Sequence, residues 1–331
     1  MKHIIATVLL LVVFLQCRCI AQPADTLGIR LENYTYPYPV LFYTTTVGRQ
    51  PVEIAYMDVK PQSANGKTVL LFHGKNFPAA YWAGTIDALT AAGYRVIARD
   101  ALGFGKSSKP VVQYSFSLLA ALDKELVDML HIDKVYVVGH SMGGMVAARF
   151  ALTYPETVNA LVLEDAIGLE DWRSKGVPYR KVDVWYEDEQ KATHESIKSY
   201  HKNTYYPNWK DTYEEWVNVQ YGLTQSRNFD RLAWVNALTY DMIYNQPVVH
   251  EFGGIKVPAL VVVGTEDHTK LARGASKEVM DKLGHYEQLG RETAQAIPGA
   301  ELIVYKGHGH VPHLEIPAQY HKDLLQYLSK H

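Results

Sequence analysis

The chain has 331 residues, of which 47% are hydrophobic and 21% are charged, with 33 basic and 35 acidic side chains. This composition excludes disordered, collagen-like and disulfide-stapled chains. The net charge of -2 provides no broad positive field for a nucleic acid or an anionic membrane surface. The length allows either two domains or one large α/β domain that carries an insertion.

The first 21 residues have the pattern of a secretory signal peptide. Residues 1–3 are short and basic, residues 4–15 form an apolar run, and a small residue, Ala21, ends the segment. A membrane anchor is the competing interpretation, but a spanning helix needs about 20 apolar residues and this run stops at residues 16–18. A lipid anchor on Cys17 is a weaker alternative, because bulky residues precede it.

Cleavage after Ala21 removes both cysteines, Cys17 and Cys19, and leaves 31 basic and 35 acidic side chains. We therefore expect a secreted or periplasmic mature chain with a net charge of -4, no thiol and no membrane span. Such a chain is held together by its core and not by disulfides, and a length of about 310 residues suffices for that.

Beyond the leader, short apolar runs alternate with stretches of helical spacing, which is typical of a mostly parallel sheet flanked by helices. Continuous apolar runs, as opposed to alternating ones, indicate strands that are buried on both faces. Strands are predicted at 68–72, 95–98, 135–138, 160–163, 259–263 and 302–305, and helices at 82–92, 117–130 and 142–152.

This alternation stops between residues 168 and 251. Five of the six tryptophans of the chain lie there, together with nine tyrosines, and no strand-like run is present. We interpret residues 168–251 as a helical cap inserted into an α/β core formed by residues 22–167 and 252–331. Most of these rings are expected to form the core of the cap, and a few to face a ligand.

Residues 139–144 (GHSMGG) follow a predicted strand and open a predicted helix. A nucleophile elbow requires this context, because the tight turn exposes a hydroxyl above the sheet, here that of Ser141, and the glycines allow close backbone approach. The pattern G-x-S-x-G alone is weak, since typical glycine and serine frequencies produce it by chance in about one chain of this length in ten. The flanking strand and helix strengthen it.

A serine nucleophile needs a base, and the base needs an orienting acid, in the chain order serine, acid, histidine. Residues 264–267 (GTED) leave the strand that ends at 263, and Asp267 is the preferred acid. Residues 306–313 (KGHGHVPH) leave the next strand, and His310 is the preferred base.

Rivals remain open for both roles. His308 and His313 are the alternative bases in the same loop. Glu164 and Asp165 follow an earlier strand and are the alternative acids, whereas Glu266 is interpreted as a solvated loop charge.

Acyl transfer also needs donors for the developing oxyanion. We expect one from the backbone N–H of Met142 and the second from the backbone N–H of Lys75, in the loop 73–77 (HGKNF), with Asn76 as the fallback. Only the backbone of Lys75 is assigned a role, and its side chain is compatible with a surface charge. Residues 100–108 (DALGFGKSS) lack the G-x-G-x-x-G of a dinucleotide site and are interpreted as a structural loop near the pocket.

Three histidines, His308, His310 and His313, lie close together, but they lack the spacing of a zinc motif, so we expect no metal and no cofactor. The motifs together resemble the α/β-hydrolase fold superfamily, in particular its capped serine hydrolases. The resemblance runs from about residue 42 to the carboxyl end and rests on residues 73–74, 100–107, 139–144, 264–267 and 309–317.

This resemblance implies an α/β-hydrolase fold, with Ser141 as nucleophile, Asp267 as acid and His310 as base. Two departures from the pattern stand out. Lys75 replaces the apolar or aromatic residue common after His-Gly in esterases. Glu164 and Asp165 add carboxylates where dehalogenase-like relatives place their acid.

The predicted function is that of a cofactor-independent serine hydrolase that cleaves an ester, thioester or lactone bond of a small, partly apolar molecule. Carbon–carbon bond hydrolysis of a diketone-like substrate is the alternative enzyme, and a perhydrolase-like side activity through Ser141 stays open. A ligand-binding protein that kept the fold without turnover is the alternative outside enzymes. The serine excludes dehalogenases and epoxide hydrolases, which resemble the family but carry a carboxylate at the elbow.

Overall fold

The computed structural model describes residues 27–331, so the predicted signal peptide and its cleavage site lie outside the described residues. Its centre is an eight-stranded sheet with the order β1-β2-β4-β3-β5-β6-β7-β8. The strands are β1 (Val40–Val47), β2 (Gln50–Val59), β3 (Thr68–Phe72), β4 (Arg95–Arg99), β5 (Val135–His140), β6 (Val158–Glu164), β7 (Ala259–Gly264) and β8 (Glu301–Tyr305).

The six strands from β3 to β8 run parallel, and β2 pairs antiparallel with both β4 and β1. Every residue of β3, β5 and β7 is buried. Both faces of these strands are covered, which explains their continuous apolar sequences. The predicted mostly parallel sheet is confirmed, and β1 and β2 extend it at one edge.

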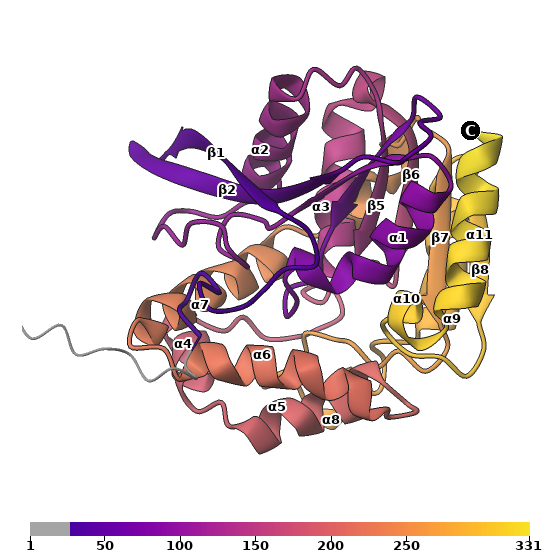
Figure 1. The fold of residues 1–331 in the computed structure, drawn as a ribbon. Coiled ribbons are helices and arrows are strands. Elements are labelled where there is room, and N and C mark those ends of the chain that lie inside the picture. The colour runs from indigo at the N-terminus through magenta and orange to yellow at the C-terminus, as the bar shows by residue number, and fades with distance from the viewer. Residues whose placement is uncertain (1–26) are drawn as a thin grey trace, which may run out of the picture.

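Helices cover the two faces of the sheet (Figure 1). On one face, α2 (Phe116–Met129), α3 (Met142–Thr153) and α9 (Tyr286–Ala296) share a core with Leu70 and Phe72 of β3. On the other face, α1 (Ala83–Ala91) and α11 (Pro317–Lys330) share a core with Val69 and Leu71 of the same strand. Alternate residues of one strand thus enter two different cores, as the pleat of a strand requires.

Between β6 and β7 the structure contains α4 (Val182–Gln190), α5 (His194–Tyr200), α6 (Glu214–Thr224) and α7 (Phe229–Asn245), and no strand. We call these four helices with their connections, residues 182–245, the helical layer; Figure 1 shows it beneath the sheet in that view. A ring pair joins α4 to α7, since Trp185 stacks on Tyr240 at 4.5 Å between centroids. The cap boundaries at 168 and 251 stay a prediction.

Two short helices, α8 (Lys277–Met280) and α10 (Pro312–Glu315), lie in the loops that follow β7 and β8. A π-helical turn, η3 (His201–Tyr205), continues α5 within the helical layer. None of the helices within residues 27–331 combines the length and the apolar character needed to cross a bilayer.

Candidate active site

Ser141 lies at the turn between β5 and α3, at the carboxyl edge of the sheet. Its backbone has φ 56° and ψ -123°, a conformation that residues other than glycine rarely adopt. Three backbone hydrogen bonds hold it there: the Ser141 N–H donates to Glu164 O (3.1 Å), and Ser141 O accepts from the N–H groups of Gly144 (2.9 Å) and Ile167 (3.2 Å). The sharp strand-to-helix turn therefore has the geometry expected of a nucleophile elbow.

The glycines at 139 and 143 allow this turn for a steric reason. A Cβ atom on Gly143 would lie 2.2 Å from the carbonyl oxygen of Phe72, and one on Gly139 would lie 2.5 Å from the carbonyl oxygen of Gly143. Helix α3 begins this close to β3 because neither position carries a side chain.

Asp267 and His310 meet as the sequence predicts. Asp267 follows β7, His310 follows β8, and His310 Nδ1 lies 2.7 Å from Asp267 Oδ2, with both side chains wholly buried. The other ring nitrogen, Nε2, is also buried and has no hydrogen-bond partner among the described residues. A carboxylate on Nδ1 fixes the ring so that Nε2 is the nitrogen left to exchange a proton.

Tyr205, in the π-helical turn of the helical layer, packs directly on His310. The two rings stack at 4.7 Å between centroids, and the His310 N–H donates to Tyr205 O at 2.9 Å. The Tyr205 hydroxyl accepts a hydrogen bond from Asn76 Nδ2 at 2.8 Å. One residue of the helical layer thus contacts both the histidine loop and the loop after β3, a link that no local sequence pattern indicates.

The rival residues form a second pair. His313 Nδ1 lies 2.8 Å from Glu164 Oε1, and both side chains are buried. The His313 ring stacks on Trp82 at 4.2 Å. Trp82 and Tyr205 both belong to the buried cluster on the α1 face, but of the two only Tyr205, which packs on His310, also lines the cavity described below. The pair of Glu164 and His313 therefore lies in the core, whereas the pair of Asp267 and His310 lies behind Tyr205, a residue of the cavity wall.

The remaining rivals take no part in either pair. Asp165 Oδ1 accepts a hydrogen bond from the Gly264 N–H at 2.8 Å. Burial raises the pKa of Asp165 well above its ordinary value, and the charge of Asp267 raises it further. His308 contributes its carbonyl oxygen to a bond from the Glu266 N–H (2.8 Å), which shapes the loop.

The two backbone N–H groups expected in the oxyanion hole flank the serine. Met142 is the first residue of α3, and Lys75 follows Gly74, where a Cβ atom would lie 3.1 Å from the Cβ of Ser141. Within residues 27–331, neither N–H donates to a backbone carbonyl. Both are therefore available to a substrate oxygen, and the first amides of a helix carry partial positive charge.

A chain of hydrogen bonds that sequence reasoning missed joins three of these loops. The Gly74 N–H donates to the Tyr81 hydroxyl (3.0 Å), this hydroxyl lies 2.9 Å from Nδ1 of His140, and Nε2 of His140 lies 2.7 Å from the carbonyl oxygen of His310. Burial, with the nearby His310 and His313, lowers the pKa of His140 well below its ordinary value. A neutral ring that donates from Nε2 and accepts at Nδ1 satisfies all three contacts.

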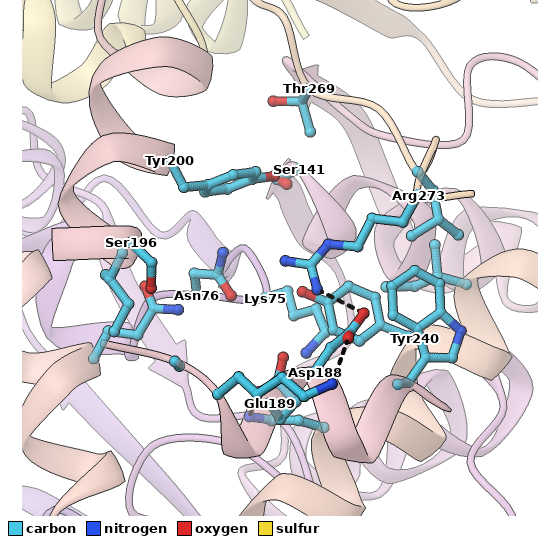
Figure 2. Close-up of a pocket in the computed structure, with 18 of the residues that line it drawn as sticks. Lys75, Asn76, Ser141, Asp188, Glu189, Ser196, Tyr200, Tyr240, Thr269 and Arg273 are labelled. Carbon is cyan, nitrogen blue, oxygen red and sulfur yellow. Dashed lines mark hydrogen bonds and ion pairs between the residues drawn. The ribbon is translucent and has the colours of Figure 1, made fainter. Parts of the chain in front are cut away.

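A cavity of about 550 Å³ lies between the sheet edge and the helical layer. Ser141 lines it, and Figure 2 shows its mixed wall of rings, polar groups and charges. The apolar part includes Ile167, Trp172, Trp185, Leu232 and Ile243. Its volume suits a small molecule. Of the five tryptophans of the predicted cap, Trp172 and Trp185 line this cavity.

Within the described part of the chain, no group of three or more histidine, cysteine, aspartate or glutamate side chains is arranged to hold a metal ion. The loop of residues 100–108 is built around a buried carboxylate: Asp100 accepts hydrogen bonds from the N–H groups of Ala79 and Lys106 (both 2.7 Å) and from the Tyr36 hydroxyl (2.6 Å). These contacts fit a structural loop.

The sequence matches the alpha/beta hydrolase fold family over residues 67–317. A 2-hydroxy-6-oxononadienedioate/2-hydroxy-6-oxononatrienedioate hydrolase from Paraburkholderia phymatum is 30% identical over 86% of this chain and 93% of the relative. A 2-hydroxy-6-oxo-6-phenylhexa-2,4-dienoate hydrolase from Burkholderia cepacia is 28% identical over 81% and 89%. The crystal structure of a probable hydrolytic enzyme from Pseudomonas aeruginosa has a TM-score of 0.90 and 46% identity, covering 92% of this chain and 98% of that one.

Proposed function

Because the chain belongs to the alpha/beta hydrolase fold family and is a hydrolytic enzyme of the serine type, we propose that it cleaves an ester-type bond of a small, partly apolar molecule. The observation that carries this proposal is the Asp267–His310 pair: its Nε2 has no partner among the described residues, and its ring packs on Tyr205, which lines the same cavity as Ser141. Ester, thioester and lactone carbonyls are the electrophiles that such a site attacks without a cofactor.

In the proposed reaction, Ser141 Oγ attacks the carbonyl carbon and His310 Nε2 takes the hydroxyl proton. Asp267 holds the imidazole through Nδ1 and stabilises its positive form. The oxyanion accepts hydrogen bonds from the N–H groups of Met142 and Lys75. His310 returns the proton to the leaving oxygen, and a water activated by the same nitrogen then releases the acid from the acyl-enzyme.

The test is turnover of a 4-nitrophenyl ester together with labelling by a fluorophosphonate probe. Ser141→Ala is expected to abolish labelling and to remove all but residual turnover. His310→Ala is expected to lose turnover by about 10³-fold or more. His308→Ala is the matched control, because it removes the neighbouring histidine that pairs with neither carboxylate. Full turnover by the Ser141→Ala protein would contradict the proposal.

Carbon–carbon bond hydrolysis is the second candidate, since two relatives that match most of this chain are named as hydrolases of oxo-dienoates. The two candidates share the fold and differ in the bond that breaks. A panel that contains simple esters, lactones and a vinylogous diketone acid separates them: cleavage of the diketone acid at a higher kcat/KM than any ester supports the second candidate.

We further propose that the protein is exported through residues 1–21, on the sequence pattern alone. Fractionation of expressing cells, followed by amino-terminal sequencing of the mature chain, tests this. A mature chain that starts at Gln22 supports export, and an uncleaved chain in the cytoplasm contradicts it.

A further inference from the structure

The side chain of Lys75 lies inside the active-site cavity. Lys75 lines the cavity together with Ser141 and Tyr240 (Figure 2). Its Nζ lies 3.9 Å from the ring centroid of Tyr240 and 5.9 Å from that of Phe104. The side chain of Lys75 is only partly exposed. The ring faces attract a positive charge, so the ammonium form is favoured by Tyr240.

This ammonium group has three hydrogens to donate, and no acceptor takes them. No hydrogen bond or ion pair joins Lys75 Nζ to any group within residues 27–331. The other cavity cations are engaged. Arg273 pairs with Asp188 at 3.2 Å, Lys191 with Asp188 at 3.8 Å, and Lys270 lies 3.3 Å from the carbonyl oxygen of Met280. Burying a lysine ammonium group in a low-dielectric space costs free energy when no hydrogen-bond acceptor is present, and a ligand that supplies acceptors removes this cost.

The charges around Lys75 leave room for an anion. Glu189, from α4, attracts the ammonium without forming an ion pair, and its Oε2 already accepts a hydrogen bond from Asn236 (2.8 Å). Arg273, from the loop after β7, repels it. Asp188 is shared by Arg180, Lys191 and Arg273. Even without the 72% exposed Lys191, three cations, Lys75, Arg180 and Arg273, outnumber the two carboxylates Asp188 and Glu189, and a bound anion reduces this excess.

We infer that the substrate carries a carboxylate, and that the ammonium group of Lys75 binds it inside the cavity while Ser141 attacks a carbonyl of the same molecule. This inference rests on the proposed function, because it assigns the substrate of the same site. The inference also goes beyond the proposed function, because the rest of the cavity lining indicates only a partly apolar molecule.

The position of Lys75 in the chain limits the distance between the two functional groups. The same residue offers its backbone N–H to the oxyanion and its Nζ to the carboxylate, so the two substrate oxygens are separated by at most the span of one lysine side chain plus two hydrogen bonds. A dicarboxylic acid monoester with a short, flexible chain meets this limit. Lysine binds such a carboxylate as a point charge with three donors.

The experiment compares two esters that differ only in charge, mono-4-nitrophenyl adipate and its methyl ester, by release of nitrophenolate. For the unmodified protein we expect kcat/KM to be higher for the anionic ester. Lys75→Met should reduce that preference by about 10-fold to 100-fold, the range expected for loss of a hydrogen bond to a charged group. Any disturbance of the oxyanion loop changes kcat/KM for both esters alike, so it cancels in the ratio of the two values.

Lys191→Met is the matched control, since this lysine lines the same cavity but its side chain is 72% exposed. Water screens its charge, so the ratio should stay within about twofold of the unmodified protein. An equal loss of kcat/KM for both esters in Lys75→Met would overturn the inference. A fall of the ratio in Lys191→Met as large as that in Lys75→Met would also overturn it.

A second measurement needs no variant and stays valid if Lys75→Met fails to fold. Free adipate should inhibit hydrolysis of the methyl ester competitively in the unmodified protein, and adipamide, which is neutral and of similar size, should inhibit it at least about tenfold less. Equal inhibition contradicts carboxylate binding. Failure of the proposed function looks different: Ser141 is then unlabelled by fluorophosphonate and neither ester is hydrolysed.

Discussion

The Tyr81 hydroxyl lies 2.9 Å from Nδ1 of His140, the residue that precedes Ser141 in the chain. The same hydroxyl accepts the Gly74 N–H, and the opposite nitrogen of His140 faces the carbonyl oxygen of His310. The loop after β3, the turn at Ser141 and the histidine loop are therefore connected through two buried side chains. Neither side chain needs to touch the substrate, so we regard Tyr81 and His140 as positioning residues.

We predict that Tyr81→Phe lowers kcat for a neutral nitrophenyl ester by about tenfold and leaves KM within about twofold. The change removes one hydroxyl and leaves the Gly74 N–H and His140 Nδ1 without their partner, which costs about 1–3 kcal/mol. Steady-state kinetics and a thermal melt measure the two effects.

Tyr43→Phe is the matched control for this prediction. Its hydroxyl is also buried and donates to a carbonyl, that of Leu122 at 2.6 Å, but it lies in the core beside α2. The Tyr43→Phe protein should lose about as much stability as the Tyr81→Phe protein, and its kcat should stay unchanged. If both variants lost kcat equally, the connection between Tyr81 and His140 would have no part in positioning.

We predict that mutation of one buried acid–histidine pair mainly lowers kcat and that mutation of the other mainly lowers stability. Asp267→Asn should reduce kcat by about 10³-fold to 10⁴-fold, since the amide no longer stabilises the imidazolium or its tautomer. Glu164→Gln should change kcat by less than about tenfold and instead lower the melting temperature, because its partner His313 lies in the core. Circular dichroism melts and ester kinetics on both proteins provide the comparison, and a reversed order of the two kcat losses would assign the acid role to Glu164.

The glycine at 143 predicts a steric effect. Gly143→Ala places a Cβ atom 2.2 Å from the carbonyl oxygen of Phe72, so α3 has to move away from β3. We expect destabilisation by about 1–3 kcal/mol or more and loss of fluorophosphonate labelling in the fraction that folds. Gly253→Ala is the control, because its Cβ would meet the nearest atom at 3.8 Å. A fully active, fully stable Gly143→Ala protein would contradict the steric account.

The charge of Lys75 predicts a pH dependence that only the anionic ester shows. Burial lowers the pKa of Lys75 from 10.5 to about 8; Glu189 opposes this shift and Arg273 adds to it. Below that pH the side chain is an ammonium, and as the pH rises through it the charge is lost. The ratio of kcat/KM for the anionic ester to that for its methyl ester should therefore fall between about pH 7 and 9.

The neutral ester serves as the internal control for that profile, because any effect of pH on the catalytic steps that the two esters share cancels in the ratio. The value of kcat/KM reports the ionisation of the free enzyme, so the midpoint should lie near the pKa of unliganded Lys75. A ratio that stays constant up to pH 9.5 would show that Lys75 keeps its charge or does not contact the substrate.

The strands that carry the site were predictable because they are buried on both faces, and their apolar sequences are continuous for that reason. The edge strands β1 and β2 were missed. They form a hairpin in which buried and exposed residues mix, so no continuous apolar run marks it. Its tight turn at Gly48 and Arg49 has positive φ at both positions, a conformation that the common Asn-Gly signal would have indicated more clearly.

Ser141, Asp267 and His310 were predictable as candidates because each follows a recognisable strand, and the carboxyl ends of parallel strands meet at one edge. The sequence ranked Asp267 above Glu164 but did not show that each of the two carboxylates pairs with a histidine of its own. It also assigned no role to the Lys75 side chain, which lines the cavity. The wall it enters is completed by Tyr240, 165 positions further along the chain, so no local pattern could reveal the cavity.

The contact between Tyr205 and His310 restricts how the helical layer can move. Its π-helical turn is fastened to the histidine loop by a backbone hydrogen bond and a stacked ring pair, so lifting the layer as one rigid lid would pull the imidazole out of register with Ser141. Ligands therefore have to enter and leave by movement of another part of the helical layer, while the turn at Tyr205 stays in contact with the histidine loop. Lengthening or shortening α4 and α7 would change the entrance to the cavity. An insertion beside residue 205 would instead separate the helical layer from the histidine loop.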